Sequence, residues 1–239
     1  MKLGSLFDGI GGFPLAGAFA GIDPVWAAEI EPFCIRVTQE RFPNMKHLGS
    51  VTDINGAEIE PVGIVTFGSP CQDLSVAGAQ KGIHDGARSS LFFEAVRIIK
   101  EMREHDRATG RTGIDVRPRF AVWENVPGAF SSNHGADFQA VLEALCKVKD
   151  PDATVPMPKG NKWIPAGCIV GNGYSIAWRV LDCQHYGCPQ RRKRIYLIAD
   201  FGSERAGEIQ FVGESVPWNP ETSGTAWERA AEYVKGCTE

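Results

Sequence analysis

The size, composition and charge of the chain already limit what it can be. Its 239 residues are 43% hydrophobic and 23% charged, the balance of a globular domain that buries a sizeable core. This balance excludes a disordered chain, a fibrous protein and a disulfide-rich miniprotein. The formal net charge is −4 and the pI is about 5.8, well below the pI above ~9 of a strongly basic nucleic-acid binder, so a polyanionic partner requires a local basic patch.

The cysteines and the N-terminus indicate the compartment. The seven cysteines are odd in number and form no Cys-x-x-Cys pair, which argues against a disulfide framework and a metal site and favours free thiols in a reducing cytoplasm. Asp8 and Pro14 interrupt the apolar stretch near the N-terminus, so we predict no signal peptide. We also predict no membrane span, since no stretch has the ~18 apolar residues that one needs.

Short apolar runs bounded by Gly, Pro and Asp alternate with amphipathic patterns, which is typical of a sheet built from βαβ units. The runs predict strands at 2–6, 24–28, 64–67 and 120–123, and the patterns predict helices at 13–20, 32–41, 91–104 and 137–147. Two later runs, 174–181 and 194–199, alternate like a hairpin and predict an antiparallel element at the sheet edge. The fold class is therefore α/β, with a mixed, mostly parallel sheet and helices on both faces.

The remaining segments are less regular. Residues 151–173 hold four prolines and four glycines, which predicts an inserted loop. After residue 201 the chain is polar and has helical character only at 226–234. We therefore predict one domain over 1–201, with the inserted loop, and a short C-terminal extension over 202–239.

The first candidate site is a glycine turn, Phe7-Asp8-Gly-Ile-Gly-Gly-Phe, between the first predicted strand and helix. Such a turn lets the backbone approach a ligand and points helix N–H groups at it. Pro14 stands where a dinucleotide fingerprint has its third glycine, which disfavours a nicotinamide cofactor. Glu29, at the end of the second predicted strand, can bind ribose hydroxyls, so the pair indicates an adenosine-containing cofactor. A purely structural turn is the alternative.

Cys71 is the second candidate, in the sequence Gly-Ser-Pro-Cys-Gln after the predicted strand 64–67. A thiol at the carboxyl end of a strand faces the ligand side of an open α/β sheet, where it suits a nucleophile. The alternative is a buried, inert cysteine, which is our interpretation of the other six.

Two further candidates are polar groups beside apolar strands. Glu124 and Asn125 follow the strand 120–123, where a carboxylate can act as an acid or, alternatively, form a cap or a loop ion pair. The basic run from Gln190 leads into the strand 194–199, and strand alternation places Arg192 and Arg194 on one face. That face could meet a phosphate or a base edge, whereas the alternative is a solvated surface.

In order and spacing these blocks resemble those of the cytosine-C5 DNA methyltransferases, over about residues 1–201. The matching blocks are FDGIGGF, GSPCQDLS, RSSLFFEAVRIIKEM, RPRFAVWENVPG and GYSIAWRVLDCQHYGCPQRRKRIYLIADF. The resemblance implies a Rossmann-like fold that binds S-adenosyl-L-methionine and methylates C5 of a flipped-out cytosine in double-stranded DNA. It also implies a cytoplasmic enzyme encoded by a bacterium or phage, as in restriction-modification systems.

The resemblance assigns roles to single residues. Cys71 matches the nucleophile that adds to cytosine C6, and Glu124, supported by Asn125, matches the acid at N3. Arg194 matches the ligand of cytosine O2, and Arg192 matches the residue that steadies the flipped nucleotide and its phosphate. The residues matching cofactor contacts are Phe7, Asp8, Gly9, Gly11, Gly12, Glu29, Ile30, Ser50, Val51, Pro70 and Leu91.

The sequence departs from the family pattern in two places. Ser50 stands where members usually carry an Asp that binds the adenine amino group, and Asp53 is a candidate substitute. We find no target-recognition domain of the usual size and no C-terminal Gly-Asn block, because only about forty residues follow Phe201. A separate recognition subunit is therefore one expectation. A non-catalytic remnant and a tRNA cytosine-C5 methyltransferase are the alternatives.

Overall fold

The computed structural model describes residues 1–70, 91–186 and 190–211. Its strands are β1 (Lys2–Leu6), β2 (Asp23–Ala28), β3 (Lys46–His47), β4 (Ile64–Phe67), β5 (Phe120–Asn125), β6 (Ala166–Gly171), β7 (Tyr174–Asp182) and β8 (Lys193–Asp200). Its α-helices are α1 (Gly12–Phe19), α2 (Pro32–Arg41), α3 (Leu91–Ala108), α4 (Ala136–Cys146) and α5 (Ala206–Phe211).

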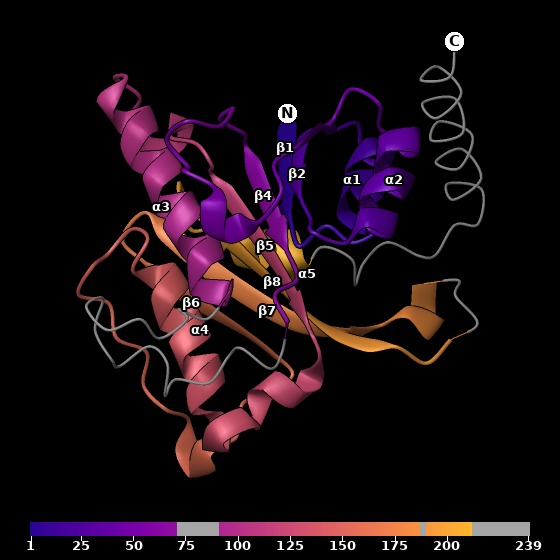
Figure 1. The fold of residues 1–239 in the computed structure, drawn as a ribbon. Helices are drawn as coiled ribbons and strands as arrows, with labels where there is room; N and C mark the ends of the chain where they lie inside the picture. Colours follow the sequence, from indigo (N-terminus) through magenta and orange to yellow (C-terminus); the bar gives the residue numbers. More distant parts are fainter. Residues whose placement is uncertain (71–90, 187–189, 212–239) are drawn as a thin grey trace.

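The strands form one mixed sheet in the order β3-β2-β1-β4-β5-β8-β7-β6. From β3 to β5 neighbouring strands are parallel, and the pairs β5–β8, β8–β7 and β7–β6 are antiparallel (Figure 1). The α/β fold class, the mostly parallel sheet and the antiparallel element beyond β5 are thus confirmed. The predicted strands and helices that lie in the described residues are all present, and the predicted helix at 226–234 lies outside them.

The prediction of an inserted loop over 151–173 is wrong for residues 166–171, which form the edge strand β6. Its six residues pair with β7 from Ala166↔Arg179 to Gly171↔Tyr174. The turn between them is Asn172-Gly173, a strong hairpin signal, and Gly173 has φ +71°. The prolines upstream obscured this signal, since they end at Pro165, one residue before the strand.

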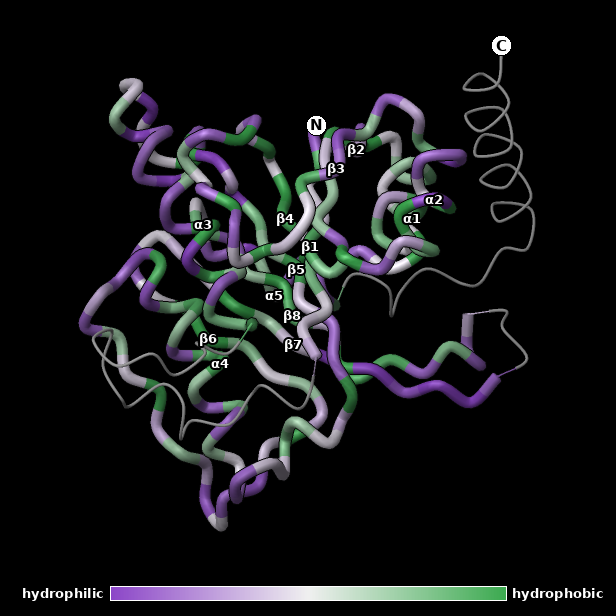
Figure 2. Tube along the Cα trace, in the orientation of Figure 1, coloured by the Kyte–Doolittle hydropathy of each residue, from purple (hydrophilic) through white to green (hydrophobic). Residues whose placement is uncertain are grey.

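The larger core lies between the sheet and helices α3 and α4. α3 is amphipathic because Phe92, Val96, Ile99 and Met102 recur at helical spacing, and all four are buried. Each such side chain contributes about 1.5–3 kcal/mol by burial. On the other face, α1 lies against β1, where Leu3 contacts Gly17, and α5 packs on β7 and β8. Figure 2 shows hydrophobic residues concentrated in the central strands, whereas the outer end of the β7–β8 hairpin is largely hydrophilic.

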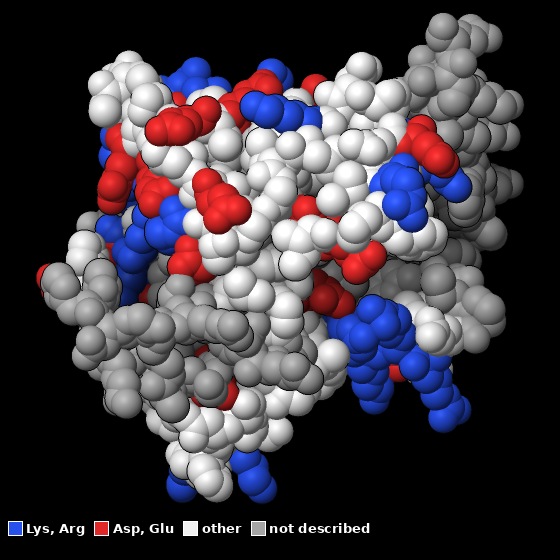
Figure 3. All heavy atoms as spheres, viewed as in Figure 1, with Lys and Arg blue, Asp and Glu red and all other residues white. Residues whose placement is uncertain are grey.

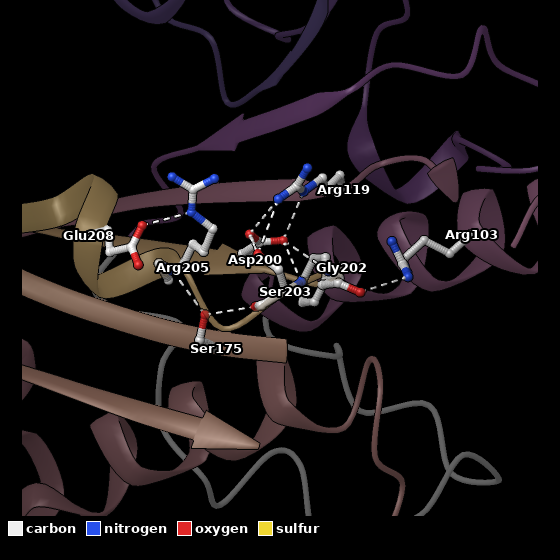
Figure 4. Close-up of polar contacts among 10 residues, drawn as sticks. Arg103, Arg119, Ser175, Asp200, Gly202, Ser203, Arg205 and Glu208 are labelled. Carbon is white, nitrogen blue, oxygen red and sulfur yellow. Dashed lines mark hydrogen bonds and ion pairs between the residues drawn. The ribbon is translucent and has the colours of Figure 1, made fainter. Parts of the chain in front are cut away.

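A buried polar network ties the start of β5 to the end of β8 (Figure 4). The Asp200 carboxylate accepts hydrogen bonds from the Arg119 guanidinium at 3.0 and 3.1 Å and from the Ser203 hydroxyl at 2.6 Å. Burial raises the pKa of Asp200, but these bonds outweigh it and hold the pKa below its usual value. Nearby, burial lowers the pKa of Arg103 to about 10, and its guanidinium donates to the Phe201 carbonyl. This network fixes the sheet at the end opposite the candidate site described below.

None of the helices in the described ranges is long and apolar enough to cross a membrane. Within the same ranges, no group of three or more His, Cys, Asp or Glu side chains is placed to hold a metal ion.

Candidate active site

The carboxyl ends of β1, β2 and β4 surround a cavity of about 230 Å³. The structure brings together seven of the predicted cofactor residues in its wall: Phe7, Glu29, Ile30, Ser50, Val51, Pro70 and Leu91. Ala28 and Gly49 complete the wall and were missed, because neither carries a side chain whose chemistry marks it in the sequence. Residues far apart in the chain therefore form one pocket at the strand ends, where ligands of open α/β sheets bind.

The size and lining of this cavity fit the base of a nucleoside. The side chains of Phe7, Ile30, Val51, Pro70 and Leu91 give it mainly apolar walls. Its volume lies below the about 300–1,000 Å³ of pockets that enclose a whole drug-sized ligand, so it has room for only part of such a ligand, such as a planar base.

Glu29 connects this pocket to the glycine turn. Its Oε2 accepts the Gly9 N–H at 2.7 Å, and its Oε1 accepts the N–H groups of Ile30 at 2.8 Å and Glu31 at 3.0 Å. A carboxylate has about four lone-pair positions, so these three bonds leave one on Oε2 for a hydroxyl donor from a ligand. The residue type and its position fit the ribose-binding role that the sequence predicts.

The other predicted residues of the glycine turn lie beside the pocket rather than in its wall. Gly9 contacts Glu29, Gly11 precedes α1 with φ +86°, and Gly12 is the first residue of α1. Gly11 also lies where a Cβ would come within 3.0 Å of the Thr38 side chain, so the packing of α2 requires glycine there.

Asp8 is the unusual group of this turn. It is only 6% exposed, and neither carboxyl oxygen has a hydrogen-bond partner among the described residues. Burial raises the pKa of Asp8 to about 6, opposed by the Ser5 hydroxyl and reinforced by the Glu29 carboxylate. Its predicted cofactor contact stays a prediction.

Ser50 lies in the pocket wall, as predicted, and its hydroxyl is 2.7 Å from the Thr52 hydroxyl. Asp53 is not among the lining residues, and it accepts a hydrogen bond from Thr52 at 3.1 Å. This geometry therefore does not support the prediction that Asp53 takes the place of the usual Asp that binds the adenine amino group.

Glu124 and Arg194 form the polar centre next to the pocket. Arg194 Nε lies 2.9 Å from Glu124 Oε1, and the two side chains are 21% and 24% exposed. The register of β5 and β8 explains the pairing: Glu124 lies opposite Tyr196, so Arg194 is its diagonal neighbour on the same face. Burial and then the Glu124 carboxylate raise the pKa of Tyr196. Arg194 Nη1 also donates to the Lys193 carbonyl at 2.8 Å.

Residues 68–70 connect this ion pair to the cofactor pocket. A Cβ at Gly68 would lie 3.3 Å from Glu124 Oε2, so a larger residue would press on the carboxylate. Asn125 Nδ2 donates to the Ser69 carbonyl and Trp123 Nε1 to the Ser69 hydroxyl, both at 3.2 Å. Pro70 then lines the pocket. The predicted nucleophile Cys71 follows directly in sequence and lies outside the described residues.

Arg192 does not join the Glu124–Arg194 pair. Its side chain is exposed, and its N–H donates to Asp182 Oδ1 at 3.0 Å across the hairpin. Figure 3 shows lysine and arginine side chains gathered where the β7–β8 hairpin projects from the sheet, so the acidic chain has the local basic patch that a polyanionic partner would require.

A larger cavity of about 620 Å³ lies between α3 and α4, and charged side chains of both helices line much of it. It contains none of the predicted site residues. We assign the chemistry to the smaller cavity because the strand ends, the ion pair and the basic hairpin meet there.

Comparisons with known proteins identify the family to which the chain is similar. The family model described as C-5 cytosine-specific DNA methylase matches residues 1–149 and 170–224. The match omits residues 150–169, which include the start of β6 and fall within the segment predicted as an insertion.

Three curated relatives show how much of such proteins the chain spans. A DNA N-6-adenine-methyltransferase of Escherichia phage P1 is 32% identical over 82% of this chain and 28% of the relative. Type II methyltransferase M2.BsuMI of Bacillus subtilis is 31% identical over 83% of this chain and 42% of the relative. Type II methyltransferase M.HhaI of Haemophilus parahaemolyticus is 29% identical over 81% of this chain and 47% of the relative. The chain thus spans less than half the length of each.

Solved structures support the fold. S. pombe Dnmt2 methyltransferase matches with a TM-score of 0.53 and 16% identity, over 91% of this chain and 56% of that one. The Entamoeba histolytica methyltransferase EhMeth matches with a TM-score of 0.52 and 16% identity, over 84% of this chain and 53% of that one. The Rossmann-like methyltransferase fold is confirmed.

Proposed function

The chain belongs to the C-5 cytosine-specific DNA methylase family, and we propose that it transfers a methyl group from S-adenosyl-L-methionine to C5 of a flipped-out cytosine in double-stranded DNA. The main support is the segment 68–70, which contacts Glu124 and Asn125 on one side and lines the cofactor pocket on the other. A base held by Glu124 and Arg194 would therefore lie next to the cofactor, with Cys71 following in the chain.

The proposed reaction uses three side chains of this site. Cytosine C5 is a weak nucleophile, so the Cys71 thiolate forms a bond to C6 and gives C5 the electron density to take the methyl group. Glu124 holds a proton at N3, where negative charge develops, and Arg194 donates to O2. The C5 proton then leaves, the bond between C6 and Cys71 breaks, and the aromatic ring is restored.

Asn125 and Arg192 have supporting roles in this proposal. Asn125 holds the Ser69 carbonyl and thereby the segment that precedes Cys71. Arg192 binds the phosphate of the flipped nucleotide, as its exposed position on the basic hairpin allows.

S-adenosyl-L-methionine supplies an electrophilic methyl group when bound. The residues present fit it: apolar walls for adenine, the open acceptor position of Glu29 Oε2 for a ribose hydroxyl, and the turn around Asp8, Gly9, Gly11 and Gly12 for the methionine part. The buried, unpartnered carboxylate of Asp8 is a polar group in that turn.

A methyl-transfer assay with product analysis tests the proposal. The chain is incubated with methyl-tritiated S-adenosyl-L-methionine and either duplex DNA or tRNA, with and without host extract, and the nucleic acid is digested to nucleosides. We expect label in 5-methylcytosine. Label in N6-methyladenine would instead match the name of the phage P1 relative, and label in tRNA alone would favour the RNA alternative. No label in any sample would favour a non-catalytic remnant.

Host extract is included because we propose a separate target-recognition subunit as one source of DNA sequence specificity. A requirement for extract would support that subunit, and full activity without it would remove the need for one. We place the protein in the cytoplasm of a bacterium or an infected cell, in line with the bacterial and phage relatives.

A further inference from the structure

We propose that Asp182 is a positioning residue that holds the end of the β7–β8 hairpin so that Arg192 can bind a DNA phosphate. This inference rests on the proposed function and adds a residue to it. Figure 1 shows the β7–β8 hairpin projecting from the sheet. Asp182 is the last residue of β7 and is only 7% exposed.

The contacts of Asp182 are all with N–H donors. Its Oδ1 accepts the N–H of Arg192 at 3.0 Å and the N–H of Gln184 at 3.3 Å, and its Oδ2 accepts the Gln184 side-chain amide at 2.9 Å. A second set of bonds supports the same turn: Cys183 N–H donates to the Arg192 carbonyl at 3.1 Å. Arg192 is thus fixed through both its N–H and its carbonyl.

The charge pattern explains why the contacts of Asp182 with N–H donors matter for an anionic ligand. Residues 179–194 contain five cations, at 179 and 191–194, and Asp182 is the one carboxylate in this stretch of sequence. A carboxylate paired with one of these cationic side chains would compete with a DNA phosphate for that side chain. Asp182 is turned to the backbone instead and forms no ion pair among the described residues, which leaves the Arg192 guanidinium available to a ligand.

The geometry separates a positioning role from a charge effect. Asn at 182 can keep its oxygen at the Oδ1 position, where it accepts from Arg192 and Gln184, and the Gln184 amide can rotate to face the new NH₂. Ala removes all three bonds. Both changes make the hairpin more positive by one unit, so pure electrostatics predicts tighter DNA binding by both.

The test measures duplex DNA affinity, S-adenosyl-L-methionine affinity and thermal stability for the full chain and four variants. These are Asp182→Asn, Asp182→Ala, Arg192→Ala and the double variant Asp182→Ala with Arg192→Ala. Asp152→Ala, at an exposed carboxylate outside the hairpin, is the control for loss of one negative charge.

We expect Asp182→Asn to bind DNA like the wild type. We expect Asp182→Ala to bind DNA about tenfold more weakly, because, of its three lost bonds, the one to the Arg192 N–H holds the phosphate-binding residue, and one hydrogen bond to a charged group has about this value. We also expect the double variant to be no weaker than Arg192→Ala, because Asp182 acts through Arg192. S-adenosyl-L-methionine affinity should not change in any of them.

Wild-type DNA affinity in Asp182→Ala, additive losses in the double variant, or tighter binding by both Asp182 variants would each overturn the inference. An equal loss of DNA and S-adenosyl-L-methionine affinity with lower thermal stability would also overturn it, since it indicates a general structural role. Methyl transfer by the wild type, measured alongside, shows separately whether the proposed function fails.

Discussion

Glu29→Gln tests the central connection of the cofactor site, the carboxylate that joins the glycine turn to the pocket. In the wild type three backbone N–H groups donate to it, two to Oε1 and one to Oε2. Gln can place its oxygen at Oε1 and keep the bonds from Ile30 and Glu31. Its NH₂ then faces the Gly9 N–H, two donors with no acceptor between them.

The expected loss of S-adenosyl-L-methionine affinity follows from the hydrogen bonds that Gln cannot accept at this position. A hydrogen bond to a charged group contributes about 1.5–3 kcal/mol, and a factor of ten in affinity corresponds to about 1.4 kcal/mol. The same NH₂ replaces the open acceptor position of Oε2, so loss of the hydrogen bond from the ribose hydroxyl should weaken S-adenosyl-L-methionine binding by roughly 10- to 100-fold, measured by calorimetric titration.

Glu31→Gln is the matched control, because it removes one negative charge two residues away. The Glu31 side chain accepts one long hydrogen bond, 3.4 Å, from the Phe33 N–H, so the S-adenosyl-L-methionine affinity of this variant should stay within about threefold of the wild type. If Glu29→Gln also stays within about threefold, or if both variants weaken binding equally, the hydrogen-bond argument is refuted.

Three other predictions concern the site and its support. Glu124→Gln should lower the methyl-transfer rate by about 100-fold or more, as for loss of a general acid, with unchanged S-adenosyl-L-methionine affinity because Glu124 does not line the pocket. Asp8→Asn should raise the free energy of unfolding at pH 8 by on the order of 3 kcal/mol. The reason is that the pKa of Asp8 rises on folding from 3.8 to about 6, so the ionised carboxylate opposes folding at pH 8. Below about pH 4 the carboxyl group is protonated in both states, and this gain in stability should vanish. Asp200→Asn should lower the free energy of unfolding, measured in urea, by about 3–5 kcal/mol, whereas Glu208→Gln, in an exposed pair with Arg205, should leave it nearly unchanged.

Each of these has a contrary outcome. Wild-type turnover by Glu124→Gln would remove it from the chemistry. A stability gain in Asp8→Asn that persists at pH 4 would show that ionisation is not its source. Equal effects of Asp200→Asn and Glu208→Gln would mean that the buried network adds nothing to an ordinary surface pair.

The sequence predicted the parallel part of the fold well because its signals are local. β1, β4 and β5 are short apolar runs with sharp ends, and α3 has a clear helical period. β6 was missed because its burial alternates only weakly and its pairing depends on a turn that follows a proline-rich stretch. The two residues of β3 are too few to give any pattern.

The site was predicted in part from residue types and in part only through the family resemblance. Position after a strand and side-chain chemistry single out Glu29 and Glu124, and the structure places them at the pocket and in the ion pair with Arg194. Ala28 and Gly49 contribute shape rather than chemistry, so nothing in the sequence marks them. Asp182 was missed because its role depends on cross-strand contacts that form only in the folded hairpin.

The most direct test of the account is covalent trapping at Cys71. The chain is incubated with S-adenosyl-L-methionine and duplex DNA that contains 5-fluorocytosine, and the products are separated on a denaturing gel. Fluorine at C5 blocks the final loss of the C5 substituent, so the account predicts a shifted band that is absent with Cys71→Ser. A band that survives in Cys71→Ser, or no band with or without host extract, would contradict the account.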